Sequence, residues 1–265
     1  MKDNGIPLKQ VVSAIEELAP PALAEEWDNV GLILNPPRVG PVRSVLLTID
    51  LTEAVAREAI ATRSQLVIAY HPPIFEPLRS LSHEVPLQRT IMSLARAGIA
   101  IYSPHTALDA ARDGVNDWLA GGVGPGRCEV LAQADATDPG TGRLIMLDRP
   151  VALPTLTRKV KQHLGLRHLR VARAGTARRI KRIALCAGAG ASALKDVRAD
   201  AYITGEMGHH DILAAVAAGV HVILSEHTHT ERGYLPLFAR RLRKAVGPSV
   251  TVRVSKKDRE PVKTV

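Results

Sequence analysis

The sequence has few cysteines and few aromatic residues, and both scarcities limit what the protein can be. Its cysteines are Cys128 and Cys186, which lie far apart in a chain of 265 residues. Two isolated thiols argue against a disulfide framework or a zinc finger and fit a reducing compartment. Aromatic residues make up 3% of the chain and hydrophobic residues 46%. The core must therefore be built mainly from Ala, Val, Leu and Ile.

Long hydrophobic runs are also missing. No apolar stretch reaches the roughly 20 residues that span a bilayer. The first residues, Met1 to Gly5, show neither a hydrophobic segment nor an Arg/Ser-rich amphipathic pattern of a targeting signal. We therefore expect a cytoplasmic protein with no membrane partner. At 265 residues, the chain is long enough for one large domain or two smaller lobes.

Positive charge is in excess, with 35 Lys and Arg against 26 Asp and Glu and a formal net charge of +9. Such an excess attracts anions in general. The basic residues form short clusters, such as Arg240-Arg241 and Arg243-Lys244, that contain no aromatic residues for base stacking. Solvated helix faces are therefore favoured over a nucleic-acid groove, and we expect no nucleic-acid partner.

Hydrophobic periodicity predicts alternating strands and helices in the first half of the chain. The expected helices are Leu8–Leu18, residues 53–62 after the cap residue Thr52, Pro86–Ala97 and a helix starting within Gly114–Leu119. The expected strands are Val45–Leu51, Leu66–Tyr70 and Ile99–Tyr102. This order predicts a parallel sheet with helices on both faces. The turn at Trp27–Leu32 is expected to place Trp27 in the core.

The second half continues the rhythm less regularly. The expected strands are Leu144–Leu147, His168–Ala172, Ile180–Ala187, Asp200–Thr204 and Val220–Leu224. The expected helices are Pro154–Leu164, Ile212–Ala218 and Tyr234–Val246. The glycine-rich turn from Gly188 to Ser192 suits close backbone approach or anion binding, although it lacks the full dinucleotide fingerprint. The predicted fold class is α/β, with mixed, largely parallel sheets.

Polar side chains collect just past the carboxyl ends of the predicted strands. Six histidines lie there: His71, His105, His209, His210, His227 and His229. The same turns contain Asp109, Glu206, Asp211 and Glu231. Ligands of open parallel sheets bind beyond the carboxyl ends of the strands, so turns distant in sequence can converge there. A lone histidine would more often be a cap or a core group, but four such turns favour a metal site.

The metal-site hypothesis is centred on the stretch Ser225–Gly233. His227 and Glu231 are four residues apart and share one face if a helix has begun; alone, such a pair could also be a cap or a surface polar pair. Imidazole and carboxylate ligands without thiolates suit zinc, manganese, iron or cobalt. Asp109 and Glu231 are candidate bridges between two divalent metal ions, and His71 is, like His227, a candidate terminal ligand. Such ions support hydrolysis of phosphate esters, amidines or related electrophiles.

Five ordered motifs, spread over nearly the whole chain, resemble the Nif-three-like family, which is also labelled GTP cyclohydrolase I type 2 homologue. The motifs are Trp27–Leu32, Tyr70–Phe75, Ser103–Asp109, Ile203–Asp211 and His227–Gly233. Tyr-His-Pro-Pro at Tyr70 and Glu-His-x-x-Thr-Glu-Arg-Gly at Glu226 are similar to the eukaryotic branch.

The resemblance implies two α/β lobes with a dinuclear metal site in the cleft between them. The lobes would be roughly residues 1–125, joined by 225–265, and residues 126–224. It also implies hexamers built from dimers, and metal ligands at His71, Asp109, His227 and Glu231. Many bacterial members have His-His where this chain has Tyr70-His71. Either Tyr70 or water then completes that shell, or one metal position binds weakly.

Two functions follow as hypotheses. The first is a metal-dependent hydrolase acting on a nucleotide-like or other anionic small molecule, with Glu206, His105, His209 or His210 supporting the ligands or transferring protons. A local helix-start role for His209-His210 is equally open, and His229 is either a substitute ligand or a surface residue. The second is a non-catalytic metal-binding regulatory or interaction protein, such as a transcription-linked partner or a metal chaperone. The family is named after a transcription-factor partner.

Overall fold

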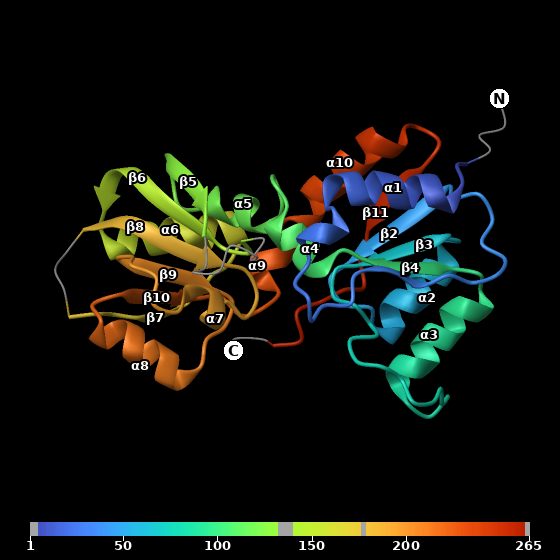
Figure 1. Ribbon diagram of the computed structural model, residues 1–265, viewed down its shortest axis with the longest axis horizontal. Coiled ribbons are helices and arrows are strands. Elements are labelled where there is room, and N and C mark those ends of the chain that lie inside the picture. The colour runs from blue at the N-terminus through green and yellow to red at the C-terminus, as the bar shows by residue number, and fades with distance from the viewer. Residues whose placement is uncertain (1–4, 132–139, 176–178, 263–265) are drawn as a thin grey trace. The chain divides into compact units, whose positions relative to one another are not determined.

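The computed structural model describes residues 5–131, 140–175 and 179–262. The chain divides into two compact units, each with its own β-sheet (Figure 1). Unit 1 comprises Met1–Ala111 and Leu235–Arg259, and unit 2 comprises Arg112–Tyr234 and Glu260–Val265. Both sheets are covered by helices, so the α/β fold class predicted from the sequence is confirmed.

The sheet of unit 1 has the strand order β1-β4-β3-β2-β11. Its strands are β1 (Gly31–Leu34), β2 (Ser44–Thr48), β3 (Leu66–Ala69), β4 (Ala100–Ser103) and β11 (Thr251–Val254). The three predicted strands β2, β3 and β4 are neighbours and parallel, as expected. β11 adds to β2 in parallel, and β1 closes the other edge antiparallel to β4. Every residue of β2, β3 and β4 is buried, which explains their continuous apolar runs.

The longer helices of unit 1 lie on the two faces of this sheet (Figure 1). α2 (Glu53–Ala61) and α3 (Pro86–Arg96) pack against each other on one face, and α1 (Leu8–Leu18) and α10 (Leu235–Val246) on the other. The short helices are η1 (Pro21–Leu23) and α4 (His105–Ala110). The side chain of Thr52 caps α2 by accepting a hydrogen bond from Val55 N at 3.4 Å, as the sequence predicts.

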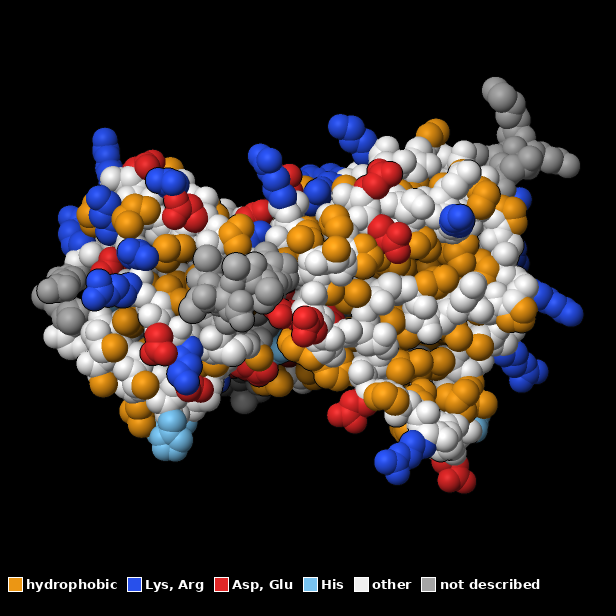
Figure 2. Space-filling view, viewed as in Figure 1, with side chains coloured by type: hydrophobic (Ala, Val, Ile, Leu, Met, Phe, Trp, Pro, Cys, Tyr) orange, Lys and Arg blue, Asp and Glu red, His pale blue; other side chains and the backbone are white. Residues whose placement is uncertain are grey.

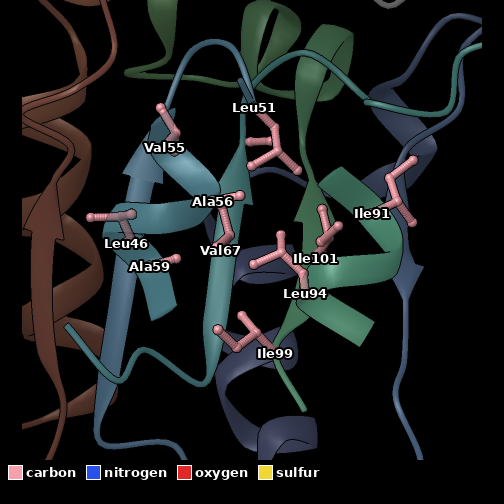
Figure 3. Close-up of a cluster of buried hydrophobic side chains, with 11 residues drawn as sticks. Leu46, Leu51, Val55, Ala56, Ala59, Val67, Ile91, Leu94, Ile99 and Ile101 are labelled. Atoms are coloured by element: carbon pink, nitrogen blue, oxygen red, sulfur yellow. The ribbon is translucent and has the colours of Figure 1, made fainter. Parts of the chain in front are cut away.

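The core under α2 and α3 is aliphatic, as the scarcity of aromatic residues requires (Figure 3). Val55 of α2 and Leu94 of α3 are fully buried, and they belong to one cluster with Val67 of β3 and Ile101 of β4. Each such side chain contributes about 1.5–3 kcal/mol when it leaves water. This packing holds β2, β3 and β4 in place and so fixes where their carboxyl ends lie.

The sheet of unit 2 is mixed, with the order β5-β6-β8-β9-β10-β7. Its strands are β5 (Gly126–Val130), β6 (Arg143–Val151), β7 (Arg170–Ala172), β8 (Ile180–Cys186), β9 (Ala201–Thr204) and β10 (His221–Leu224). β8, β9 and β10 are neighbours and parallel, whereas the other three strands pair antiparallel. The helices are α5 (Val115–Ala120), α6 (Leu153–Leu164), α7 (Ala191–Leu194), α8 (His209–Ala217) and α9 (His229–Arg232).

The expectation that Trp27 lies in the core is wrong, because its side chain is 60% exposed. The turn around it is held by polar contacts instead of by the indole. Glu25 N donates to Thr106 Oγ1 at 3.1 Å, and Asn29 Nδ2 donates to the carbonyl oxygen of Ile74 at 2.5 Å. These hydrogen bonds fix the turn without requiring burial of the large side chain.

Figure 2 shows how charged side chains are distributed on one face of the protein. On the face shown in Figure 2, Lys and Arg side chains are dispersed among acidic and hydrophobic ones and do not form one stripe. Within the described ranges, no helix combines the length and hydrophobicity needed to cross a bilayer.

Candidate functional site

In unit 1 the carboxyl ends of three neighbouring parallel strands bring predicted site residues together. Asp50 follows β2, His71 follows β3 and His105 follows β4. The backbone ladder continues past the strands, because His71 N donates to Ile49 O at 3.1 Å and His105 N donates to Tyr70 O at 3.2 Å. The sheet therefore fixes the backbone from which both imidazoles project.

The imidazole of His71 is oriented by a carboxylate. Its Nδ1 lies 2.9 Å from Asp50 Oδ1. A carboxylate on one ring nitrogen sets the tautomer and direction of a metal-binding histidine, so Nε2 would be the ligating atom. Asp50 is not among the residues predicted from the sequence, although it follows β2 as His71 follows β3. The same strand-end criterion could have found it.

His105 is held in a similar way, by Asp28. Its Nδ1 lies 2.7 Å from Asp28 Oδ1, and Asp28 Oδ2 accepts hydrogen bonds from Thr106 N at 3.1 Å and Thr106 Oγ1 at 2.5 Å. The rings of His105 and His71 are 5.3 Å apart between centroids. His105 also has a φ of 24°, a region that is rare outside glycine and often found at functional sites. The arrangement suits a proton-transfer group beside a predicted metal ligand.

The contacts of Asp28 make its pKa low. Burial of its side chain raises the pKa, but the hydrogen bond and charge of His105 and the hydrogen bonds from Thr106 lower it more. The net pKa lies below the ordinary value of 3.8. A carboxyl group whose pKa is lower in the native state than in the unfolded state stabilises the fold above the unfolded-state pKa. That stability is lost as the pH falls through the native pKa.

We therefore expect Asp28→Asn to lower the melting temperature near neutral pH by about 3–10 °C. Hydrogen bonds to a charged group are worth about 1.5–3 kcal/mol. The difference from wild type should shrink as the pH falls below the ordinary pKa of 3.8. Thermal unfolding from neutral to acid pH tests this, with the exposed neighbour Glu26→Gln as control. A difference that stays constant with pH would contradict the assignment.

Asp109, the predicted bridging ligand of unit 1, is oriented by Tyr70. It lies on α4, and its Oδ1 accepts a hydrogen bond from the Tyr70 hydroxyl. The Tyr70 side chain is 2% exposed, so this phenol is fixed by the core. Tyr70 therefore supplies a hydrogen-bond donor to a predicted ligand.

In unit 2 the parallel strands β8, β9 and β10 bring a second group of predicted residues together. His227 follows β10, and its Nδ1 lies 2.8 Å from Oε1 of Glu206, which follows β9. His227 Nε2 lies 3.3 Å from Glu231 Oε1. The Glu231 side chain is 2% exposed and projects from α9. His227 and Glu231, which are four residues apart, thus share one face. Glu206 orients His227 as Asp50 orients His71.

The glycine-rich turn after β8 approaches this pair closely, as its composition predicts. Gly188 N donates to Thr230 Oγ1 at 2.8 Å. A Cβ at Gly188 would lie 3.0 Å from both Glu231 Oε1 and His227 Nε2. Any side chain at position 188 would therefore fill the space beside the imidazole of His227 and the carboxylate of Glu231. This space and the donor set fit a divalent metal ion.

The other predicted residues of unit 2 have more local surroundings. His209 and His210 begin α8, are exposed, and contact each other with ring centroids 5.4 Å apart. His229 Nδ1 lies 2.6 Å from the carbonyl oxygen of Ser225.

A cavity of about 630 Å³ lies beside α7, β9 and α8, with Leu194 and Tyr202 in its lining. Within the described residues its lining includes none of the candidate ligands.

Comparison with known proteins identifies the family. The family model described as Duf34/NIF3 (NGG1p interacting factor 3) matches residues 6–261. The chain belongs to the Duf34/NIF3 family. It is 43% identical to the protein NIF3 homolog of Schizosaccharomyces pombe, over 97% of both chains. It is 35% identical to the NGG1-interacting factor 3 of Saccharomyces cerevisiae, over 96% of both chains. These relatives confirm the resemblance to the eukaryotic branch.

Solved structures agree with the NIF3 fold. A hypothetical protein of Staphylococcus aureus superposes with a TM-score of 0.83 at 25% identity, covering 98% of this chain and 100% of that one. A Bacillus cereus protein related to NIF3 gives a TM-score of 0.82 at 22% identity, with 97% and 98% covered. Reduced HcgD from Methanocaldococcus jannaschii gives 0.80 at 24% identity, with 93% and 96% covered. At these identities the likeness concerns the fold.

Proposed function

We propose that this NIF3-family protein is a metal-dependent hydrolase of a nucleotide-like or other anionic small molecule. One observation carries the proposal: both candidate histidine ligands have Nδ1 beside a carboxylate. His71 has Asp50 at 2.9 Å, and His227 has Glu206 at 2.8 Å. Carboxylate partners of this kind commonly support metal-binding histidines, and their occurrence in each unit supports a function in metal binding.

The ligands would be His71, Asp109, His227 and Glu231. His71, His227 and Glu231 supply two imidazoles and one carboxylate, a donor set for zinc, manganese, iron or cobalt. Asp109 would add a second carboxylate and so allow a second ion. The hydrogen bond from Tyr70 would hold Asp109 in the orientation for that role. The proposal requires residues of both units to bind the same pair of ions.

Divalent ions in such a centre supply Lewis-acid stabilisation of an anionic substrate and activate water. The chain itself supplies the remaining roles. His105, held at Nδ1 by Asp28, would transfer a proton through Nε2. Glu206 would keep the imidazole of His227 oriented. His209 and His210, exposed on the first turn of α8, are further candidates for proton transfer. The net charge of +9 favours the collection of anions.

The decisive experiment combines metal analysis with an activity screen over nucleotides, including GTP, and phosphoesters. We expect the purified protein to bind divalent metal and to turn over at least one of these compounds. Asp109→Ala should reduce turnover by more than about 100-fold, the upper loss seen for supporting partners of metal ligands. Asp148→Ala, which removes an exposed carboxylate of β6, is the matched control. A wild-type protein that binds no metal would contradict the proposal.

A second candidate is a non-catalytic metal-binding interaction protein. It is favoured by the name of the yeast relative, NGG1-interacting factor 3, which indicates a protein partner for that relative. Metal binding without turnover in wild type and Asp109→Ala, together with partner capture by both, would support this function. For either function, we propose that the protein is cytoplasmic and forms a hexamer built from dimers.

A further inference from the structure

An exposed pair of aromatic side chains lies beside the predicted proton-transfer group of unit 1. The chain has two Trp and two Phe, and one of each is exposed here: Trp27 at 60% and Phe75 at 52%. Their ring centroids are 5.8 Å apart, with an angle of 53° between the planes. In a sequence with so few aromatic residues, two adjacent exposed rings are unusual, and such groups commonly mark binding surfaces.

Hydrogen bonds fix the turns that contain these two aromatic residues. Asn29 Nδ2 donates to the carbonyl oxygen of Ile74 at 2.5 Å, which ties the turn of Trp27 to the turn of Phe75. Asp28, the residue after Trp27, has a buried side chain that accepts hydrogen bonds from both the backbone and the side chain of Thr106. Before Trp27 in the chain, Glu25 N donates to Thr106 Oγ1 at 3.1 Å. The backbone is therefore tied down on both sides of Trp27, which favours a preorganised binding surface.

The pair is also connected, through His105, to the candidate metal ligand His71. The ring centroid of His105 lies 6.1 Å from that of Trp27 and 6.4 Å from that of Phe75. The ring centroid of His105 also lies 5.3 Å from that of His71. A ligand on the exposed rings would therefore lie one side chain away from a predicted metal ligand.

We propose that Trp27 and Phe75 form a stacking site for the planar heteroaromatic ring of a nucleotide whose anionic part binds at the metal ions. This inference rests on the proposed function and names its substrate class. Stacking on Trp and Phe tolerates any base, because every base has a π-face. A nucleotide is favoured over a protein partner because two rings are a small fraction of the roughly 800 Å² that a partner buries on each side.

Three probes test the site on the metal-loaded full-length protein: GMP, ribose 5-phosphate and guanosine. GMP and ribose 5-phosphate share the phosphate monoester and differ by the base. We expect GMP to bind about 10-fold more tightly or better, since stacking of one base is worth about 1–3 kcal/mol. Trp27→Ala should abolish this ratio, and Trp27→Phe should keep most of it. Leu81→Ala, which removes another exposed hydrophobic side chain of unit 1 (59%), should leave the ratio unchanged.

The outcomes separate the stacking site from the proposed function. Melting temperatures and metal titrations of the variants should match wild type, because Trp27 is exposed and is not a ligand. Equal binding of GMP and ribose 5-phosphate, or a ratio that survives in Trp27→Ala, would overturn the stacking site alone. If ribose 5-phosphate failed to bind while guanosine bound through Trp27, the anion-binding metal centre on which the proposed function depends would be contradicted, and the ring contact alone would remain. A Trp27→Ala variant that changes only the oligomeric state would identify a protein interface instead and overturn the inference.

Discussion

Replacing Glu231 with glutamine is expected to lower the affinity for divalent metal by more than about 100-fold while the protein stays folded. The substitution keeps the shape of a side chain that is 2% exposed and removes its negative charge. Its Oε1 lies 3.3 Å from His227 Nε2, so the charge is lost beside the imidazole that would share the ion. Loss of a ligand should exceed the 10–100-fold typical for loss of a supporting partner. Competition titration against a chelator measures the affinity.

The metal affinity is expected to fall by different amounts in different variants. This order distinguishes a metal ligand from a residue that only supports one. Glu206→Gln should cost about 10–100-fold, because Glu206 would act through its contact of 2.8 Å with His227 Nδ1. Glu129→Gln, at an exposed position of β5, should have no effect. If Glu231→Gln bound metal as well as Glu129→Gln does, Glu231 would not be a ligand, and the proposed donor set would fail.

The interior strands could be predicted because burial on both faces leaves a continuous apolar run. β2, β3, β9 and β10 are buried at every position, and each was predicted within a few residues of its ends. The edge strands β5 and β11 were missed for the opposite reason, whereas the edge strand β7 lies within the predicted strand His168–Ala172. All five residues of β5 are exposed, and β11 has one buried position. Their membership of a sheet depends on a neighbouring strand, which no local pattern records.

The residue types of the site could be predicted, whereas their pairwise contacts depend on sheet register. β2 and β3 pair Thr48 with Ala69, so Asp50 and His71, each two residues further along, come side by side. The sequence alone did not give this register, and Asp50 was missed. Trp27 was misplaced because hydrophobicity was taken to require burial, while the polar contacts that hold its turn come from residues as distant as Thr106.

Gly205→Ala is expected to disturb the site of unit 2 through the backbone. A Cβ at this position would lie 2.7 Å from Gly188 O, 2.7 Å from His227 Cα and 2.9 Å from Glu226 O. All three are backbone atoms and cannot rotate away. The turns that follow β8, β9 and β10 must then move apart. Overpacking of this kind costs about 1–3 kcal/mol, so the melting temperature should fall by about 2–12 °C.

The same variant tests whether the packing of these turns is needed for metal binding. Moving the backbone of His227 away from the turn of Gly188 should weaken metal binding even well below the melting temperature, because a metal site tolerates little displacement of its ligands. Gly40→Ala is the matched control, since a Cβ there would meet no atom within 4 Å and its φ is not positive. A Gly205→Ala protein that melts and binds metal like Gly40→Ala would show that the three turns are not packed as described. The orientation of His227 toward Glu231 would then lose its physical basis.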